Sequence, residues 1–574
     1  MNNKELADVF TLIANLSEIK GEIIYKTLAY RRAAENLTGL GRDVNEYWKE
    51  RKLEDIPGVG KAISEKIDEL LRTGKLEFLE KLKKEVPASL ADWLQVPGLG
   101  PKKVALIWKE IHITALPELE KAARAGKLRD LPGMGEKSEA QILTGIESLS
   151  RRSGRIPIGR AFPLVQEIIA ALLKVPGVKA AEPAGSLRRM RSTVGDLDIL
   201  VAAKESGPVM DVFTSLPGVS RVLGKGPTKA SIEFGDGLRA QLWVHPPEHF
   251  GTALVYATGS KDHNVRLREL ALDKGLSLSE HSLIHTDGSG EITCATEEDV
   301  YAALGLPWIP PELREDHGEV QAAKAGKLPR LIELADIHAD LQVHSNWSDG
   351  KLTMLEMARL AAKRGMKVIA FTDHSVSLGV ANGLSMERHA EQQAEIEKAQ
   401  RSLGDSIRIL HATEVEIKAD GTLDYPDEFL ASLDLVLASL HSSLRQPRQK
   451  VTERLLNAIR NPYVDIIGHP TGRLLPDREG ADLDMEAVLA AAAESGVALE
   501  INSDPARLDL EDPTARRAKE LGIPISINTD SHSAAMFDNL PFGVAIARRA
   551  WLTKADVINA WPVDKLLAWL KKRK

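Results

Sequence analysis

The sequence predicts a multidomain protein with an all-α N-terminal region, an α+β core and a C-terminal barrel of seven alternating strands and helices. Three observations support this prediction. The chain has 574 residues, enough for about four domains of roughly 150 residues each. A Pro-Gly turn recurs three times within the first 150 residues. From residue 335 onward, short apolar strands alternate with helices, which is typical of a parallel barrel.

The composition is that of a globular protein. Hydrophobic residues make up 43% of the chain, charged residues 27%, and the net charge is −7, which argues against disorder. Cys294 is the only cysteine, so one chain cannot form a disulfide framework or a cysteine-rich zinc site. The longest apolar run, Ala487 to Ala493, is too short to cross a bilayer. We therefore expect a cytoplasmic protein with no membrane partner.

Three similar turns in the N-terminal region each open a helix. Each reads hydrophobic-Pro-Gly-hydrophobic-Gly, and their glycine pairs are Gly58 and Gly60, Gly98 and Gly100, and Gly133 and Gly135. The free N–H groups of a new helix suit a phosphate, and Lys102 adds positive charge beside the second turn. One copy alone would more often be an ordinary turn between helices. Three copies resemble helix-hairpin-helix motifs, which bind the DNA backbone without reading its sequence.

A carboxylate pair marks the α+β core, in the segment "GSLRRMRSTVGDLDILV". Asp196 and Asp198 point to the same face of a strand because side chains alternate with period two. Two adjacent carboxylates suit Mg²⁺ or Mn²⁺. Upstream, Gly185 and Ser186 would let hydrogen-bond donors approach a triphosphate, and Arg189 would add charge. The alternative is a surface strand that merely carries two acidic residues.

These residues resemble those of the family X DNA polymerases, the relatives of DNA polymerase beta. The segment "YATGSKDHNVRLR" is similar to the family's segment that contacts dNTP and template. The resemblance implies that Tyr256, Gly259 and Asn264 contact the incoming nucleotide and that Arg268 lies on the template side. Lys66, in "SEKIDEL", matches the Schiff-base lysine of the family's lyase; an ordinary exposed lysine is the equally weighted alternative.

One position departs from the family's pattern. The third metal-binding aspartate of the family belongs on the strand "GLRAQLWV", where this chain has Gln241. A neutral amide cannot neutralise the metal ion, and the loss of such support commonly costs several kcal/mol in the transition state. We therefore expect nucleotide binding to survive and polymerisation to be weakened. If residues 235–237 form a hairpin loop, Glu233 lies diagonally beside Gln241 and could replace the missing carboxylate.

Histidines and carboxylates gather at the predicted strand ends of the C-terminal zone, where the active sites of such barrels lie. One strand-end histidine would more often be structural, but this many predict a metal centre. Mixed nitrogen and oxygen ligands favour Zn²⁺, Mn²⁺ or Fe²⁺ over Mg²⁺. The expected chemistry is phosphoester hydrolysis, with His344 and His441 essential. The predicted metal ligands are His344, Asp349, His374, Glu414, His441, His469, Asp530 and His532.

This zone resembles the PHP domain, named for polymerase and histidinol phosphatase, and the resemblance implies a (βα)7 barrel that holds up to three metal ions. The family usually opens with His-x-His, whereas this chain has Gln342 at the first position. Asp340 shares the face of Gln342 and is an alternative ligand. Arg507 is a candidate for binding substrate phosphate. Three further histidines do not match the motif and are expected to be structural or on the surface: His338, His389 and His411.

The order of these zones resembles that of bacterial and archaeal family X polymerases. We expect helical DNA-binding domains, a nucleotidyltransferase palm, a subdomain that contacts dNTP and template, a linker and the PHP barrel. The expected boundaries are 1–90 and 91–155 for the two helical domains, 156–250, 251–320, 321–334 and 335–574.

The resemblance implies a monomeric DNA repair enzyme of base excision repair that acts on gapped or nicked DNA. It would use dNTPs, and the PHP barrel would supply a 3′–5′ exonuclease or a related 3′-end processing activity. Two alternatives remain. The barrel could be a small-molecule phosphatase such as a histidinol phosphatase, or the protein could be a non-catalytic scaffold that binds gaps.

Overall fold

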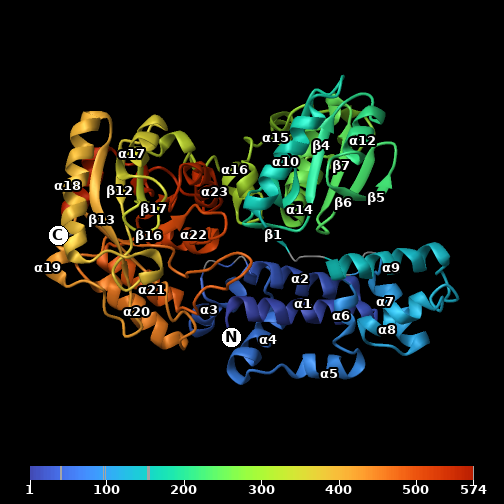
Figure 1. Ribbon diagram of the computed structural model, residues 1–574. Helices are drawn as coiled ribbons and strands as arrows, with labels where there is room; N and C mark the ends of the chain where they lie inside the picture. The colour runs from blue at the N-terminus through green and yellow to red at the C-terminus, as the bar shows by residue number, and fades with distance from the viewer. Residues whose placement is uncertain (39, 41, 95, 97, 152–154, 573–574) are drawn as a thin grey trace. The chain divides into compact units, whose positions relative to one another are not determined.

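The computed structural model describes residues 1–38, 40, 42–94, 96, 98–151 and 155–572. The chain divides into two compact units, residues 1–153 and 154–574, and many of their elements are labelled in Figure 1. None of the helices within the described ranges combines the length and the apolar character that crossing a membrane requires.

The described part of the first unit is helical throughout, as the sequence predicts. In its first helix, Leu6, Phe10 and Ile13 recur at helical spacing and are fully buried in the unit's core. Gly21 ends that helix in the left-handed conformation, at φ 89°. The α-helices are α1 (Asn3–Lys20), α2 (Ile24–Thr38), α3 (Val44–Lys49), α4 (Lys61–Thr73), α5 (Glu77–Glu85), α6 (Leu90–Trp93), α7 (Pro101–Ile111), α8 (Leu116–Arg124) and α9 (Glu136–Arg151).

The second unit begins with a five-stranded sheet in the predicted palm. Its strand order is β2-β4-β7-β6-β5, and only the β4–β7 pair is parallel. Two helices contribute buried side chains to the same core as the sheet: α10 (Ile158–Leu172) and α12 (Gly207–Thr214). The strands are β2 (Ala180–Pro183), β4 (Leu197–Ala202), β5 (Val219–Lys225), β6 (Lys229–Phe234) and β7 (Arg239–His245), with β1 (Ile156–Pro157) pairing β3 (Thr193–Val194) beside them.

The next segment builds a core of its own around Leu267, Tyr301 and Ile309. It combines helices with a small antiparallel sheet. Its elements are α13 (Phe250–Thr258), α14 (Lys261–Asp273), β8 (Leu276–Leu278), β9 (Leu283–His285), β10 (Glu291–Ile292), α15 (Glu297–Ala303), η3 (Pro311–Leu313) and α16 (Glu319–Lys324).

A buried carboxylate joins this segment to the palm. Glu297, only 5% exposed, accepts paired hydrogen bonds from Arg314 in its own segment. It also accepts two from Arg188 in the short palm helix α11 (Gly185–Arg188). Burial alone would raise the pKa of Glu297, but Arg314 and Arg188 lower it to about 2.

We expect Glu297→Gln to lower the free energy of unfolding at pH 7 by about 3 kcal/mol, because it leaves buried guanidinium groups without their counter-charge. A carboxyl whose pKa is lowered by folding stabilises the protein above its ordinary pKa, and that stability is lost as the pH falls through the folded value. The difference from the parent should therefore shrink as the pH falls from 4.5 towards 2. Urea unfolding at several pH values measures it, and an equal deficit at pH 3 and pH 7 would exclude charge as the cause.

The C-terminal region forms the predicted barrel of seven parallel strands, in the order β11 to β17. A parallel bridge from Val343 to Ser531 brings the end of the first strand beside the segment that follows the last. The strands are largely apolar and buried on both faces, as parallel strands covered by helices are. They are β11 (Ala339–Val343), β12 (Val368–Phe371), β13 (Arg408–Glu416), β14 (Leu435–Ser439), β15 (Ile466–Ile467), β16 (Ala498–Asn502) and β17 (Ile525–Asn528).

Helices follow the barrel strands in alternation, in yellow to red in Figure 1. The helices are α17 (Met354–Lys363), α18 (Met386–Leu403), α19 (Asp427–Leu430), α20 (Arg448–Arg460), α21 (Met485–Ser495), α22 (Asp512–Glu520), α23 (Leu540–Arg549) and α24 (Val563–Lys572).

Candidate active sites

The palm brings the predicted carboxylate pair and Gln241 together. Asp198 lies in β4 and is the register partner of Gln241 in β7. The Gln241 amide donates a hydrogen bond of 3.2 Å to the carboxylate of Asp196. Burial and the neighbouring Asp196 raise the pKa of Asp198 to about 7. Two carboxylates so placed favour a cation between them, and Gln241 contributes no charge to that site.

Glu233 lies where the sequence places it relative to Gln241. In the β6–β7 hairpin Ser231 faces Gln241 and Glu233 faces Arg239, so the predicted register is confirmed. Glu233 is 1% exposed, and its carboxylate lies 3.6 Å from the Arg239 guanidinium. This ion pair within the sheet engages the carboxylate that was considered as a replacement for the missing aspartate.

Gly185 lies close to the carboxylates, in the left-handed backbone region that favours glycine. Its φ is 58°, and a Cβ atom there would lie 2.4 Å from a carboxylate oxygen of Asp198. Arg189, four residues on, is bound on two sides. Its Nε lies 3.0 Å from the carboxylate of Glu315, and its guanidinium donates to the carbonyl of Thr258 at 2.9 Å. No pattern in the sequence indicates Glu315 as the partner of Arg189.

The predicted nucleotide-contacting residues lie together at the turn between α13 and α14. Asn264 donates a hydrogen bond of 2.6 Å to the carbonyl of Tyr256, whose side chain is 41% exposed. A Cβ atom on Gly259 would lie 2.4 Å from the side-chain oxygen of Asn264, so a larger residue here would have to displace the Asn264 side chain. Arg268 follows one helical turn later and donates to the carbonyl of Asn264.

Glu414 is the centre of a buried cluster at the C-terminal ends of the barrel strands. Four imidazoles surround its carboxylate: His469 at 2.9 Å, His441 at 3.2 Å, and His344 and His374 at 3.3 Å. Glu414 is 1% exposed. Four ring nitrogens around one buried carboxylate form a set of nitrogen and oxygen donors that suits a transition metal.

The remaining predicted ligands adjoin this cluster. His532 lies 3.3 Å from Asp349, and His344 lies 3.1 Å from Asp530. Within the described residues, three overlapping groups have the donor spacing that a metal ion needs, and both His344 and Glu414 are shared between groups. The barrel therefore brings all of the predicted ligands to one mouth.

Two further observations fit bound metal. Among the described residues, both ring nitrogens of the fully buried His344, and one nitrogen each of His374 and His469, make no hydrogen bond of good geometry. Carboxylates nevertheless lie 3.1 to 3.3 Å from His344 Nε2 and 3.3 Å from His374 Nδ1. The backbone is strained at two of the ligands, because His469 and Asp530 adopt φ values of 26° and 54°. Imidazole nitrogens held beside carboxylates without a well-formed hydrogen bond are placed to share a metal ion with them.

Two carboxylates that contact the cluster, Glu416 and Glu500, were not predicted from the sequence. Glu416 accepts a hydrogen bond of 2.8 Å from His441 and so orients that imidazole. Its spacing of two residues from Glu414 on one strand was an available signal. The side-chain amide of Gln342 lies against the carboxylate of Glu500, and Asp340 accepts a hydrogen bond from the backbone of Thr529. Neither Gln342 nor Asp340 belongs to the three groups found within the described ranges.

Arg507 lies beside the metal-ligand cluster. Its Nε is 3.7 Å from the carboxylate of Asp530, and its side chain is 16% exposed. Burial, followed by the charge of Arg507, lowers the pKa of His469. A guanidinium at the edge of such a cluster suits the phosphate of a substrate.

The three N-terminal turns share one backbone geometry. The first glycine of each turn has a positive φ, 75° at Gly58, 89° at Gly98 and 72° at Gly133. The last glycine precedes the new helix, and its carbonyl accepts the first helical hydrogen bonds. A Cβ atom on Gly60, Gly100 or Gly135 would have no described atom within 4 Å. The helix starts are therefore open to an approaching anion, and Lys102 is exposed beside the second.

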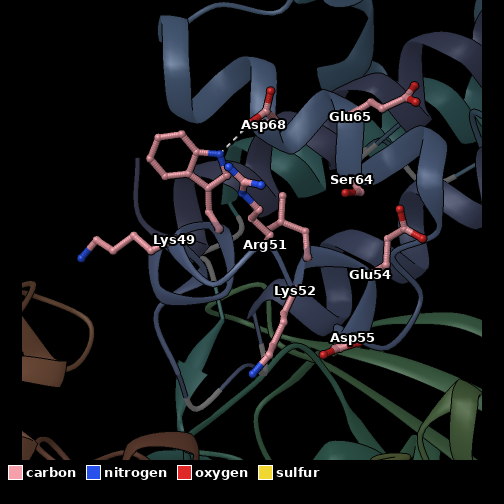
Figure 2. A pocket seen from close by; sticks show the side chains of 10 residues that line it. Lys49, Arg51, Lys52, Glu54, Asp55, Ser64, Glu65 and Asp68 are labelled. Atoms are coloured by element: carbon pink, nitrogen blue, oxygen red, sulfur yellow. Dashed lines mark hydrogen bonds between the residues drawn. The ribbon is translucent and has the colours of Figure 1, made fainter.

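Lys66 lies on α4 among aromatic rings. Its Nζ is 5.0 Å from the ring centre of Phe78 and 6.0 Å from that of Tyr30, and it donates to the carbonyl of Ala62. A separate pocket of about 940 Å³ in the same unit includes Ser64 and Asp68 of α4 but not Lys66. Figure 2 shows lysine, arginine and carboxylate side chains around that pocket. It contains none of the predicted site residues.

Four family models match the chain. Residues 1–76 match a helix-hairpin-helix domain, and residues 90–148 match a tandem helix-hairpin-helix model. Residues 253–315 match the DNA polymerase beta thumb, and residues 340–504 match the PHP domain. The segment that follows the palm is therefore called the thumb below.

Similar proteins agree with this order. The Bacillus subtilis protein named DNA polymerase/3′–5′ exonuclease PolX is 39% identical over 575 residues, which cover 100% of both chains. Rat DNA polymerase lambda is 26% identical over 54% of this chain and 56% of its own. A Thermoanaerobacter protein named probable phosphatase is 33% identical over 39% of this chain and 89% of its own length.

Proposed function

This chain belongs to the bacterial family X DNA polymerases that carry a PHP domain, and we propose that it repairs gapped or nicked DNA by filling gaps and trimming 3′ ends. The observation that carries the proposal is the convergence of four imidazoles on Glu414 at the barrel mouth. The same chain carries a helical unit that matches DNA-binding motifs and a palm with two carboxylates. These domains favour DNA as the substrate of the barrel.

We assign the nucleotidyl transfer site to the palm and thumb. Asp196 and Asp198 would hold Mg²⁺ or Mn²⁺, which neutralises the triphosphate and favours ionisation of the primer hydroxyl. The nucleotide would contact Gly185, Ser186, Arg189, Tyr256, Gly259 and Asn264, with Arg268 on the template side. Nucleotide binding would survive with Gln241 in place of aspartate, but polymerisation would be weakened, because the amide adds no negative charge to the metal site.

We assign 3′–5′ exonuclease activity to the barrel. Glu414 and the seven other predicted ligands would hold up to three ions of Zn²⁺, Mn²⁺ or Fe²⁺, which would activate water and stabilise the leaving oxygen. Arg507 would bind the phosphate of the terminal nucleotide. The dense cluster beside an arginine supports hydrolysis of a phosphodiester.

We assign DNA-backbone binding to the N-terminal unit, with residues 1–90 and 91–155 as its two domains. The open helix starts at Gly60, Gly100 and Gly135 support this assignment. Lys66 would serve as the Schiff-base nucleophile of a lyase in base excision repair. The rings of Phe78 and Tyr30 beside its amine support this role, because they shield the amine from part of the solvent. The protein would act as a monomer.

A small-molecule phosphatase is the second candidate for the barrel. The similarity to a protein named probable phosphatase, which covers 89% of that protein, favours it. The two candidates differ in substrate, so turnover of histidinol phosphate faster than that of DNA ends would replace the exonuclease proposal.

A gel assay on gapped DNA with a labelled primer tests the proposal, with Mn²⁺ or Mg²⁺ and with or without dNTPs. We expect shortening of the primer in Mn²⁺ and weak extension with dNTPs. His441→Ala should abolish shortening and leave DNA affinity unchanged, because His441 lies only in the barrel cluster. Asp196→Ala should abolish extension alone.

The two variants control for each other, since each keeps the other site intact. Loss of both activities in either variant would contradict separate sites. Tight binding of gapped DNA with no change to any substrate would instead support a non-catalytic scaffold.

A further inference from the structure

Three arginines from two regions of the second unit converge on one carboxylate. Glu315 of the thumb lies 2.9 Å from Arg549, 3.0 Å from Arg189 and 3.6 Å from Arg191. Its side chain is 10% exposed. Burial alone would raise the pKa of Glu315, but Arg549, Arg189 and Arg191 hold it below its ordinary value. Glu315 therefore remains charged and serves as the centre of this ion cluster.

Arg549 reaches this cluster from the barrel. It ends helix α23, its side chain is 1% exposed, and it donates a 2.7 Å hydrogen bond to the main-chain carbonyl of Arg189. A second 2.7 Å bond from Arg549 goes to Asp512 in the barrel helix α22. The Nη2 atom of Arg549 therefore binds the barrel through Asp512. Its Nη1 atom binds the palm at the Arg189 carbonyl and the thumb at Glu315.

The groups that Arg549 contacts are continuous with both nucleotide-contacting segments. Arg189 directly follows the palm helix α11, which begins at Gly185. The Arg189 guanidinium bonds the carbonyl of Thr258, the residue before Gly259. Movement of Arg549 would therefore displace the Gly185 segment and the Gly259 segment relative to each other.

The surrounding joint between palm and barrel is closely packed. A Cβ atom on Gly159 of α10 would lie 2.5 Å from the ring of Pro505, in the barrel loop that also carries Arg507. Phe162 of α10 packs edge-on against Phe542 of α23, with ring centres 5.8 Å apart. A closely packed interface transmits small displacements because it has few voids to absorb them. A shift of the barrel would therefore shift Arg549 relative to the palm.

We propose that Arg549 is a positioning residue for nucleotide binding, so that the PHP barrel builds part of the polymerase's nucleotide site. Arg549 does not touch the nucleotide. It holds Arg189 and Glu315, which set the spacing between the Gly185 and Gly259 segments. This inference rests on the proposed nucleotide site of the palm and thumb, and it gives the barrel a role in synthesis that is separate from hydrolysis.

The test uses the full chain and measures the Kd of a complementary dNTP on gapped DNA with Mn²⁺, alongside primer shortening without dNTP. We expect Arg549→Met to raise the nucleotide Kd about tenfold, since small displacements of binding groups are costly, and to leave shortening unchanged. Asp512→Asn, which alters only the barrel-side partner, should raise the Kd less. The matched control is Arg548→Met. Arg548 lies on the same helix and binds Glu312 and the carbonyl of Ile332, so its loss should not change the Kd.

The outcomes separate this inference from the proposed function. A parent protein that binds no nucleotide would refute the palm site itself. A parent that binds nucleotide, together with an Arg549→Met variant of equal affinity, would overturn the role of Arg549, as would an equal loss in Arg548→Met. If Arg549→Met also loses shortening, Asp512→Asn decides: a weaker nucleotide affinity supports the proposal and an unchanged one contradicts it.

Discussion

Glu414→Gln is expected to lose at least about a hundredfold of the barrel's metal-dependent 3′-end degradation, a larger effect than removing an outer partner of a ligand. The carboxylate of Glu414 faces four histidines and is shared between two of the candidate metal groups. An amide in its place keeps the shape but removes the charge and one of the oxygen donors. Degradation rates in Mn²⁺, measured together with the metal content of the purified protein, give the result.

Glu428→Gln is the matched control, because Glu428 belongs to the same barrel and is exposed. It should keep the parent's metal content and rate. The affinity of Glu414→Gln for gapped DNA should also equal that of the parent. A Glu414→Gln variant that degrades DNA normally would place hydrolysis outside this cluster.

The second large effect concerns the palm. We expect Gln241→Asp to raise the rate of primer extension by about a hundredfold, because a third carboxylate supports the charge that develops during nucleotidyl transfer. The change also removes the hydrogen bond that Gln241 donates to Asp196 and adds repulsion that only a divalent ion relieves. The gain should therefore require Mg²⁺ or Mn²⁺, as single-nucleotide insertion on gapped DNA would measure.

Gln241→Asn is the control, since it shortens the side chain without adding charge, and it should give no gain. Combining Gln241→Asp with Asp196→Ala should abolish extension. If Gln241→Asp extends primers no faster than the parent, position 241 does not limit the reaction.

Local patterns were enough to predict the repeating architecture and much of the candidate sites. A period of two along a strand placed Asp196 and Asp198 on one face, and the hairpin loop fixed Ser231 opposite Gln241. In the barrel, parallel strands have a common direction, so residues at strand ends such as His344 and Glu414 must meet. Each of these predictions depends only on neighbouring elements.

Contacts between distant elements could not be predicted in this way. Arg189 is predicted to face a nucleotide, but its two protein partners could not be predicted: Glu315 pairs with its charge, and Arg549 donates to its carbonyl. Nothing in the local pattern around Arg189 indicates which helix packs there. The pairing of Gln342 with Glu500 has the same origin, because it depends on how the first and sixth barrel strands face each other across the interior.

The last glycines of the three N-terminal turns leave some helix stability unused. Gly60 and Gly100 cap their helices with φ near −90°, a conformation open to every residue, and a side chain there would meet no described atom. Serine would cap these helices better, by a few tenths of a kcal/mol. A screen for folding stability would therefore favour replacing them, while any methyl or hydroxyl group would hold a phosphate away from the helix start. Under the proposed DNA-backbone contact, glycine at these positions would serve binding and not folding.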